Sequence, residues 1–564
     1  MRQERLLAPD LAPGRPNLLL AGFSATGKTS AGALVAERLA MPFVDLDAVA
    51  AGRLGMTLPE AFRNLGEARF REIEAKLLRE ARRLSGTVIA VGGGAVLQPD
   101  LGPLAEAGVA QLLTARPEEI ERRLGDASSR PLLAEAPRES IRELLAEREP
   151  AYAALGPALD TGGKTISEVA GAVIDRYLAE ADGKTSRLTV RGPDGEYLVR
   201  VGDDSLSRLD ELLSTQLPRA ARVVLVCDEA VLESAGARVA EQLRSGGRQV
   251  AALTVRSGEQ AKGILAVTAL WDHFQELAID RGDVVVAVGG GAALDAIGFA
   301  AATWLRGVAW VTVPTTILAM VDAAIGGKVA IDREGAKNSV GAFHHPRLVI
   351  CDPTVLATLP DRVARDGLAE VVKSAALASP LALDAIAGSR SQRPGLPAHL
   401  DWMIEQAVRI KAAYVSADPE DLGLRQSLNL GHTYAHGLEA ASDYVIPHGR
   451  AVAVGLLAAA TLGARLGLTP AEFSTQLREV LSKLGLLEEM PAVARERVRS
   501  ALLLDKKRRA GVPAFVVPTP GGAVLVSGLE LEVALAPLWE VLAHSDAGAD
   551  SEREVSAALA ETPR

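Results

Sequence analysis

The chain has 564 residues, a length that predicts three or four domains rather than one ordinary core. Its formal net charge of −10 and its 4% aromatic content argue against a protein that coats nucleic acid, although they allow anionic small-molecule ligands. Cys227 and Cys351 are the two cysteines and lie in separate apolar runs, which argues against a disulfide framework and against a thiolate zinc site.

The sequence lacks the pattern of a signal peptide and that of a membrane span. The N-terminal residues contain no apolar run of the required length. The longest apolar stretch, between Arg450 and Arg465, is too short to cross a bilayer and predicts a buried helix. We therefore expect a cytoplasmic protein that has neither a membrane nor a nucleic acid as its partner.

Strand-like and helical patterns alternate in two successive α/β units, which predicts parallel sheets covered by helices. A polar linker and a hairpin signal around GPDG separate the two units. After about residue 361 helical patterns dominate, with one further hairpin expected at 514–527. The expected boundaries are a P-loop domain at 1–180, a linker at 181–187, an α/β domain at 188–355, a helical domain at 356–545 and a polar tail at 546–564.

Residues 22–29, GFSATGKT, match the phosphate-binding pattern G-x-x-x-x-G-K-[ST] directly after a predicted strand and at the start of a predicted helix. In that context backbone N–H groups from Gly22 to Gly27 hold phosphate oxygens, Lys28 reaches the β- and γ-phosphates, and Thr29 binds Mg²⁺. The motif predicts a nucleoside triphosphate as ligand but does not identify the acceptor.

Asp45 and Asp47 end the predicted strand FVDLD with period-two spacing, so both carboxylates are expected on one side of it. One, taken here as Asp45, could bind Mg²⁺ with Thr29, while the other accepts a proton from a hydroxyl; two surface aspartates are the alternative. The glycine triplet at 92–94 allows a small ligand to approach the backbone closely.

The order and spacing of GFSATGKT, FVDLD, LGEARFREIE, VIAVGGGAVL, SSRPLL and EREPAY resemble those of shikimate kinases over about residues 15–180. The resemblance implies that Asp47 orients the attacking hydroxyl and that Arg130 closes from a lid onto the transferring phosphoryl group. The residues that it implies for holding shikimate are Asp47, Arg71, Gly93 and Arg148. Arginines suit a carboxylate-bearing triol because their planar fork forms paired hydrogen bonds with the carboxylate.

A second glycine triplet, at 289–291, ends an apolar strand, and Asp295 follows it. A glycine triplet before a helix suits a pyrophosphate, although alone it is weak evidence. Further along, Lys328, Lys337 and Asn338 surround glycines and predict an anion pocket. A solvated loop is the alternative, and for Lys337 considered alone it is the better one.

Three of the eight histidines are concentrated in one stretch: His432, His436 and His448. His432 and His436 are four residues apart, so on one helix they share a face and could both bind a metal. Glu370, on another predicted helix, is a candidate third ligand. Histidines that are hydrogen-bonded in a helical core are the alternative, and periodicity does not decide which two of the three would bind.

Over about residues 188–545 the chain resembles 3-dehydroquinate synthases, through segments such as GGGAALDAIGFAAATWLRG, GAKNSVGAFHHP, GLAEVVKSA and GLRQSLNLGHTYAHGLEA. The resemblance implies that Glu370, His432 and His448 bind the metal, usually Zn²⁺ or alternatively Co²⁺. His436 is then an acid/base residue, and Lys328 is a second catalytic group. Arg306 is implied to reach the substrate phosphate of a neighbouring subunit, which predicts a homodimer.

The same resemblance implies two larger sets of binding residues. Those for the heptulosonate phosphate are Asp322, Lys328, Asn338, Lys373, Lys411, Arg425, Asn429, His436 and Lys507. Those for NAD are Asp228, Glu259, Lys262, Gly290, Gly291, Asp295, Thr315, Thr316, Lys337 and Thr358.

The two resemblances together imply a P-loop kinase domain with a parallel sheet, an α/β dinucleotide-binding domain and an all-helical metal-binding domain. The implied activities are phosphorylation of shikimate by ATP with Mg²⁺, and NAD- and metal-dependent conversion of 3-deoxy-D-arabino-heptulosonate 7-phosphate to 3-dehydroquinate with release of phosphate. Another small-alcohol kinase fused to a different sugar-phosphate cyclase or to a polyol dehydrogenase is the alternative within enzymes. A regulatory protein that binds nucleotide without turnover is the alternative of another class.

Overall fold

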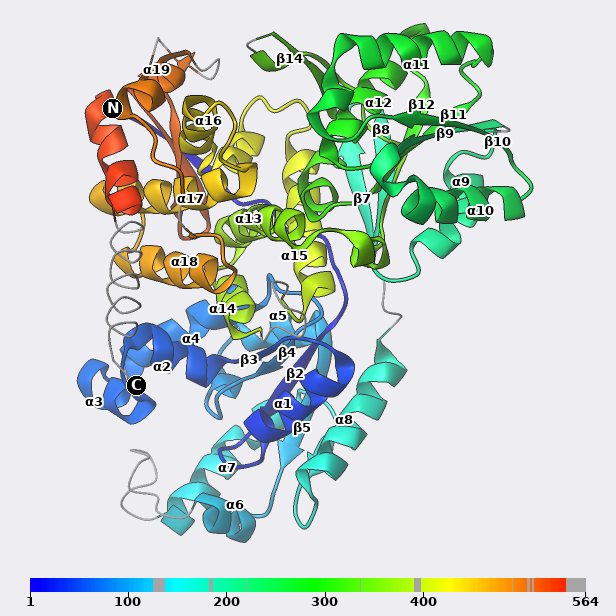
Figure 1. Cartoon of the computed structure of the whole chain (residues 1–564). Helices are drawn as coiled ribbons and strands as arrows, with labels where there is room; N and C mark the ends of the chain where they lie inside the picture. Colours follow the sequence, from blue (N-terminus) through cyan, green and yellow to red (C-terminus); the bar gives the residue numbers. More distant parts are fainter. Residues whose placement is uncertain are drawn as a thin grey trace, which may run out of the picture. The chain divides into compact units, whose positions relative to one another are not determined.

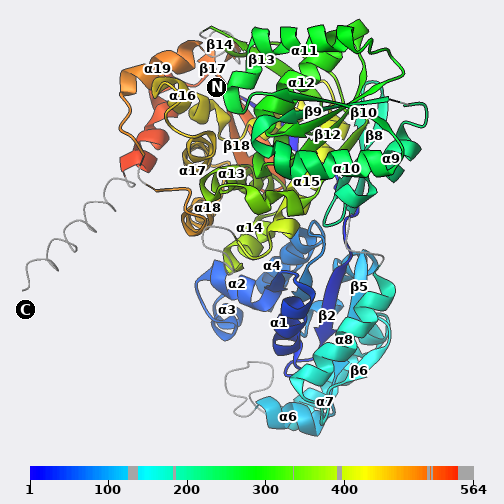
Figure 2. The ribbon, with the colours of Figure 1, turned by 45° about the vertical axis from the view of Figure 1, so that its right-hand side comes forward.

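A computed structural model describes residues 1–124, 137–181, 186–220, 222–334, 336–389, 397–488, 490–504, 508–509 and 512–543 (Figures 1 and 2). These residues form two compact units. We call the first the P-loop unit; it comprises Pro13–Lys184 and Ser379–Arg390. The second, the metal-site unit, comprises Met1–Ala12, Thr185–Ala378 and the described residues after Ser391. Within the described ranges, no helix has both the length and the apolarity that a bilayer span requires. The predicted polar tail lies outside the described residues.

The P-loop unit is built on a five-stranded parallel sheet with the strand order β3-β4-β2-β5-β6. Every residue of the central strand β2 is buried, which is typical of a parallel sheet covered on both faces. On one face, Val35 of α1 packs with Val169 and Val173 of α8 in a single apolar cluster. The strands are β2 Asn17–Gly22, β3 Phe43–Asp45, β4 Val88–Ala90, β5 Gly108–Thr114 and β6 Ala158–Asp160. The helices are α1 Lys28–Leu39, α2 Leu46–Leu54, α3 Leu58–Leu65, α4 Glu67–Ala81, η1 Ala95–Leu97, α5 Leu101–Glu106, α6 Pro117–Leu124, α7 Pro137–Ala153, α8 Ile166–Glu180 and, from later in the chain, α14 Pro380–Gly388.

The metal-site unit contains a seven-stranded sheet with the order β10-β9-β11-β12-β15-β8-β7. It is parallel except for β7, which pairs antiparallel with β8 and so confirms the hairpin predicted around GPDG. The strands are β7 Ser186–Gly192, β8 Gly195–Val201, β9 Arg222–Asp228, β10 Gln249–Val255, β11 Val284–Gly289, β12 Ala309–Pro314 and β15 Leu348–Cys351, with a separate hairpin of β13 Lys328–Arg333 and β14 Ala336–Phe343. The helices are η4 Leu206–Arg208, α9 Leu209–Gln216, η5 Glu229–Val231, η6 Leu232–Gly236, α10 Ala237–Ser245, η7 Gly258–Lys262, α11 Ile264–Glu276, α12 Gly291–Thr303, η8 Trp304–Arg306, η9 Ala319–Ala323 and η10 Pro353–Thr358.

The later part of this unit is mostly helical, and its centre is α17, which is buried as predicted. The hairpin expected at 514–527 is present as β18 and β19, and β1 joins its edge antiparallel to β19. The elements are α13 Asp361–Ala378, α15 Leu400–Ala417, η11 Leu424–Asn429, α16 His432–Ala441, α17 His448–Arg465, α18 Ala471–Lys483, α19 Arg495–Leu504, β16 Arg508–Arg509, β17 Val512–Pro513, β1 Arg2–Leu7, β18 Phe515–Thr519 and β19 Gly522–Ser527. Both cysteines are buried free thiols. The predicted α/β fold class with a helical C-terminal part is confirmed.

Two segments fold with a different unit from the residues next to them in the sequence. Strand β1 precedes the P-loop unit in the chain but pairs with β19 of the metal-site unit. Helix α14 follows α13 of the metal-site unit after the single residue Ser379, yet it is part of the P-loop unit. Helical patterns are predicted where α14 lies, whereas no strand is predicted at β1, and neither segment's sequence identifies its partner.

Candidate active sites

The P-loop connects β2 to α1 and curls around its own lysine. Lys28 Nζ donates hydrogen bonds to the carbonyl oxygens of Gly22 and Phe23, at 2.9 and 2.8 Å. Gly27, with a φ of 94°, is the residue immediately before α1. A lysine ammonium and the N-terminus of a helix therefore lie together, and both favour anionic oxygens.

Asp45 connects the P-loop to the beginning of α2. Its Oδ2 accepts a hydrogen bond from Thr29 Oγ1 at 2.6 Å, and its Oδ1 accepts from the backbone N–H groups of Asp47 and Ala48. The prediction that Asp45 and Asp47 end one strand is wrong, because Asp45 caps a helix and Asp47 lies in the first turn of that helix. Thr29 and Asp45 nevertheless meet, and a hydroxyl beside a carboxylate is a donor pair suited to Mg²⁺.

The first glycine triplet lies against the other predicted acceptor residues. A methyl group built on Gly92 would come within 2.6 Å of Asp47 Oδ1, and one built on Gly93 within 3.2 Å of Ser24 N in the P-loop. Arg148 Nη1 donates to the Gly93 carbonyl oxygen at 3.0 Å. Any side chain at Gly94 would overlap the guanidinium of Arg71. The triplet therefore brings Asp47, Arg71 and Arg148 together beside the phosphate loop.

Two supporting residues of this pocket escaped the sequence analysis. Glu74 pairs with Arg71 at 2.8 Å, and Tyr152 donates a hydrogen bond to the Gly93 carbonyl oxygen at 2.9 Å. They lie three and four residues after Arg71 and Arg148, so helical spacing could have identified them. Burial opposes the charge of Arg71, but the carboxylates of Glu74 and Glu67 outweigh it and raise the arginine's pKa. Arg130, the predicted lid residue, lies outside the described residues.

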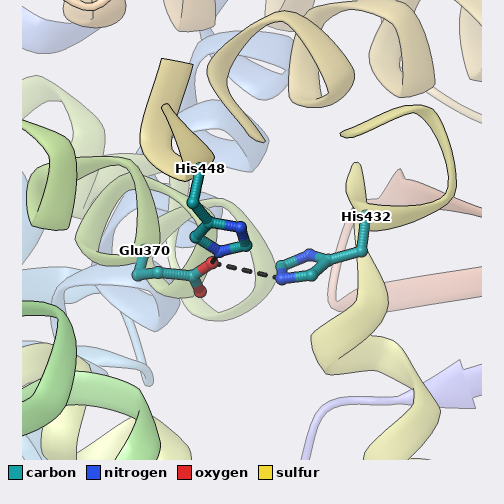
Figure 3. A group of neighbouring side chains, drawn as sticks. All are labelled: Glu370, His432 and His448. Atoms are coloured by element: carbon teal, nitrogen blue, oxygen red, sulfur yellow. Dashed lines mark hydrogen bonds and ion pairs between the residues drawn. The ribbon is translucent and has the colours of Figure 1, made fainter. Parts of the chain in front are cut away.

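In the metal-site unit three side chains from three helices meet (Figure 3). Glu370 lies on α13, and His432 and His448 are the first residues of α16 and α17. Glu370 Oε1 is 3.2 Å from His432 Nε2 and 3.3 Å from His448 Nε2, and all three prospective ligand atoms lie within 4.8 Å of one another. Both imidazoles point at the carboxylate, which is the convergence that a metal site requires.

The other ring nitrogen of each histidine has its own acceptor. His432 Nδ1 is 3.1 Å from the Leu430 carbonyl oxygen, and His448 Nδ1 is 3.3 Å from Glu439 Oε1. Such contacts fix the tautomer, so that Nε2 remains available to a metal. Glu439 was missed in the sequence, although it lies seven residues, or two helical turns, after His432 on the same predicted helix. His436 stands edge-on to His432, with 5.6 Å between ring centroids, and is not one of the three converging residues.

The electrostatics of this cluster are dominated by compensated buried charges. Burial favours the neutral form of Glu370, but Lys373 and the two histidines outweigh it and hold the pKa of Glu370 well below its ordinary value. Burial lowers the pKa of His432. For His448 burial is outweighed by Glu370 and Glu439, which raise its pKa to about 10. In the metal-free protein His448 therefore holds a proton that a metal would have to displace.

A group of ion-paired lysines adjoins the cluster. Lys373 pairs with Glu370 and lies 3.9 Å from Asp322, whose Oδ1 accepts from Lys411 Nζ at 2.5 Å. Burial lowers the pKa of Lys411 to about 8. Arg425 donates to the carbonyl oxygens of Gly326 and Pro419, so it holds the glycine turn that precedes Lys328. Lys328 pairs with Asp421, and Asn429 is half-buried at the end of η11. Lys507 lies outside the described residues.

The residues predicted for NAD lie around the second glycine triplet and the strand ends beside it. Gly289 ends β11, and a methyl group built there would come within 2.9 Å of Asp228 Cβ at the end of β9. Gly290 precedes α12, which begins at Gly291. Thr315 N donates to the Gly289 carbonyl oxygen at 3.0 Å, and a methyl group on Gly290 would touch Thr316 Cγ2 at 3.4 Å. These contacts bring the ends of β9, β11 and β12 together.

Two ion pairs join residues that are predicted to bind NAD. Lys262 pairs with Asp295 at 2.6 Å and donates to Asn338 Oδ1, and Lys337 pairs with Glu259 at 2.8 Å. Burial raises the pKa of Asp295 to about 6. Thr358 and Arg306 lie exposed at the ends of η10 and η8. Among the described residues, neither of them forms a hydrogen bond or ion pair with another predicted site residue.

Fold and site together define a P-loop phosphotransferase unit joined to a second unit that has an α/β dinucleotide fold and a helical metal site. Sequence models of three families match the chain: shikimate kinase over residues 24–178, 3-dehydroquinate synthase N-terminal over 252–366, and 3-dehydroquinate synthase C-terminal over 367–508. The chain belongs to the 3-dehydroquinate synthase family and carries a shikimate kinase domain before the synthase region, as the two resemblances implied.

Individual relatives agree with this assignment. The 3-dehydroquinate synthase of Nostoc punctiforme is 38% identical over 348 residues, which are 61% of this chain and 96% of that protein. The 2-epi-valiolone synthase of Actinosynnema mirum is 39% identical over 341 residues, 59% of this chain and 88% of that protein. A solved structure of 2-epi-5-epi-valiolone synthase from Streptomyces hygroscopicus, with NAD⁺ and Zn²⁺ bound, matches with a TM-score of 0.56 and 27% identity; the match covers 62% of this chain and 97% of that one.

Proposed function

We propose that the chain is a bifunctional enzyme that phosphorylates shikimate with ATP and converts 3-deoxy-D-arabino-heptulosonate 7-phosphate to 3-dehydroquinate with release of phosphate. The observation that supports the proposal is that each unit brings together described side chains suited to its reaction. Asp47, Arg71 and Arg148 meet beside the P-loop in one unit, and Glu370, His432 and His448 converge beside the ion-paired lysines in the other.

In the kinase reaction Arg71 and Arg148 would bind the carboxylate of shikimate, for which their planar guanidinium groups are suited. Asp47 would orient the attacking hydroxyl group and accept its proton. Lys28 would neutralise phosphate charge, with Arg130 assigned the same role from the lid, while Thr29 and Asp45 would hold Mg²⁺. ATP supplies the phosphoryl group, and Mg²⁺ neutralises the charge that develops on it.

The residues around the second glycine triplet fit a dinucleotide. The N-terminus of α12 lies next to Gly290 and Gly291, and a methyl group on Gly291 would lie 3.3 Å from Ala323 Cβ, so a larger side chain would crowd this turn. Asp228, at the end of β9, is placed like the acidic residue that binds ribose hydroxyl groups in dinucleotide folds. A bound NAD⁺ would supply reversible hydride transfer, so the overall reaction would have no net redox change.

The donor set of one carboxylate and two imidazole nitrogens fits Zn²⁺ or Co²⁺, and three protein ligands leave a position free for substrate. Held by Glu370, His432 and His448, the metal would supply Lewis-acid polarisation of substrate oxygen atoms. Lys373, Lys411 and Lys328 would neutralise the carboxylate and phosphate of the substrate. His436, one helical turn from His432, would move protons, while Asn338, Arg425, Asn429 and Lys507 complete the proposed substrate set.

A homodimer is part of the proposal. Arg306 is exposed and has a φ of 65°, and its neighbour Leu305 has a φ of 50° and is also exposed. Backbone strain of this kind persists where a surrounding structure or a function requires it. Arg306 would reach the substrate phosphate of a second subunit, so an Arg306→Ala chain should lose synthase activity and regain part of it when mixed with a metal-site variant such as Glu370→Gln.

We place the enzyme in the cytoplasm, which fits the metabolites on which it would act.

The test is a pair of assays on the full chain. Phosphate release from the heptulosonate 7-phosphate is measured with NAD⁺ and Zn²⁺, and shikimate phosphorylation is measured with ATP and Mg²⁺. Lys28→Ala should abolish the second activity and leave the first, because the lysine belongs to the P-loop unit. Loss of both activities in this variant would contradict two independent sites.

A different sugar-phosphate cyclase is the second candidate for the function of the metal-site unit. The 2-epi-valiolone synthase of Actinosynnema mirum is as similar to this chain, at 39% identity, as the 3-dehydroquinate synthase of Nostoc punctiforme, at 38%. Turnover of a sugar phosphate without a carboxylate, in preference to the heptulosonate phosphate, would favour it. A dehydrogenase would instead accumulate NADH in step with substrate consumed, whereas the proposed synthase releases phosphate without lasting NADH absorbance.

A further inference from the structure

Helix α14 is an element of the P-loop unit that the kinase sequence does not encode. It lies at Pro380–Gly388, outside the shikimate kinase match at 24–178 and inside the synthase match at 367–508. Its apolar face, including Leu381, Leu383 and Ile386, is buried. The helix packs on α4 and on β3, and both figures of the whole chain show it beside α4 (Figures 1 and 2).

An ion network centred on Arg53 attaches α14 to the helices of the proposed kinase site. Arg53 Nη2, in the last turn of α2, is 2.7 Å from Asp384 Oδ2 on α14 and 2.8 Å from Glu80 Oε2 on α4. Their side chains are 24%, 23% and 10% exposed, respectively, so the network is largely removed from water. Burial works against the charge of Arg53, but Glu80 and Asp384 outweigh it and raise its pKa. Ser379 Oγ adds a hydrogen bond of 3.1 Å to the Glu80 carbonyl oxygen.

The two helices joined by this network are the ones that carry the proposed acceptor-binding residues. Asp47 lies in the first turn of α2, and six residues separate it from Arg53, or about 9 Å along a helix. Arg71 lies on α4, nine residues before Glu80. Strand β3, on which α14 also packs, ends at Asp45, the residue that caps α2. Asp384 therefore contacts, through Arg53, the helices that carry Asp47 and Arg71.

We propose that Asp384, which lies in the synthase part of the sequence, is a positioning residue for shikimate in the kinase reaction. The inference rests on the proposed kinase function. When Asp384 is neutralised, the ion pair from α2 to α14 is replaced by at most a neutral hydrogen bond, which holds the helices less strongly. The angle between α2 and α4 is then less constrained, and so is the separation of Asp47 from Arg71. ATP is bound by the P-loop, with which this network shares no residue, so its binding should change little.

The experiment uses steady-state kinetics of the full chain with Asp384→Asn, Asp384→Glu and a control, Asp100→Asn. Asp100 pairs with Arg79 of α4 at 2.7 Å, and its side chain is 28% exposed, so the control removes a similar ion pair from the same helix. We expect Asp384→Asn to raise KM for shikimate about fivefold, which corresponds to about 1 kcal/mol. KM for ATP and the synthase activity of the same chain should stay within twofold. Asp384→Glu should restore part of the affinity, and Asp100→Asn should behave like the unaltered chain.

Several results would overturn the proposal. An unchanged KM for shikimate in Asp384→Asn would do so, and so would a fall in kcat alone, because α14 would then merely contribute to the amount of folded protein. If Asp384→Asn does not fold, as judged by thermal unfolding, Asp384→Glu and Arg53→Lys carry the test through the same KM measurement. Absence of shikimate phosphorylation by the unaltered chain would refute the kinase function itself, which separates that failure from a failure of the positioning role.

Discussion

Replacing Glu439 with glutamine should weaken metal binding by about tenfold. Glu439 is 8% exposed and its Oε1 lies 3.3 Å from His448 Nδ1, while His448 Nε2 faces Glu370. A carboxylate in this position orients the imidazole and increases its basicity, and loss of such a partner costs about 10- to 100-fold in metal affinity, or about 1.4 to 2.8 kcal/mol. The contact is long for a charge-assisted hydrogen bond, so we expect the lower end of that range.

The assay is competition for Zn²⁺ against a fluorescent chelator, with the full-length chain at constant pH. Glu276→Gln is the matched control, because Glu276 also lies beside a histidine nitrogen, His273 Nδ1 at 3.2 Å, but on an exposed helical surface. The control should leave Zn²⁺ affinity unchanged, and the P-loop unit should retain shikimate phosphorylation in both variants. A change of less than twofold in Glu439→Gln would refute the reasoning that this carboxylate prepares His448 for the metal.

Three further predictions concern the protonation of His448, the pairing of β1 and the glycine before α16. The pKa of His448 is raised from 6.5 to about 10, so in the metal-free protein its stabilising charge is fully present below about pH 6.5 and is lost as the pH rises towards 10. Metal binding should therefore release one proton, and Zn²⁺ affinity should rise about tenfold per pH unit between pH 6.5 and 10. Calorimetry in buffers of different ionisation enthalpy measures the number of protons released. A value of zero would contradict the prediction. Deletion of residues 1–8 removes β1, with its buried Leu6, from the edge of β19. It should therefore lower the temperature of half-inactivation for the synthase but not for the kinase. An equal fall in this temperature for both activities would contradict the assignment of β1. Gly431→Ala should cost more stability than Gly247→Ala and should also weaken Zn²⁺ binding. Both glycines have φ near 78°, but only at 431 does the added methyl group come within 2.8 Å of a backbone atom, Leu456 N. Equal shifts in the unfolding midpoint of the two variants would show that the steric overlap is relieved.

Much of both sites could be predicted from the sequence because their geometry is local. The P-loop is a strand, a turn and a helix within a single segment, so residue spacing alone specifies which backbone groups and which lysine face the phosphate. The strand ends of the second unit were predicted for the same reason, since parallel strands that alternate with helices place their carboxyl ends at one edge. Helical periodicity correctly placed His432 and His436 on a common helix.

Periodicity failed where a side chain changed the local structure or where two distant segments meet. Asp47 is predicted on a strand, but the Asp45 carboxylate accepts two backbone N–H groups and caps a helix that begins at Leu46. Spacing could not choose between His436 and His448, because His448 comes from the first turn of a different helix. Only the packing of α13, α16 and α17 brings that helix end to Glu370.

The amino-acid sequence by itself determined the two enzyme families, the order in which they follow one another and the residue types available to each site. Tertiary structure decided which of those residues meet, and it decided the partners of β1 and α14. The nine-residue helix α14 lies where helical patterns are predicted, whereas the six residues of β1, RQERLL, include no β-branched or aromatic side chain that would predict a strand. Their partners lie hundreds of residues away in the chain, and only the tertiary structure brings together the complementary surfaces and charges, such as those of Arg53 and Asp384, that select them.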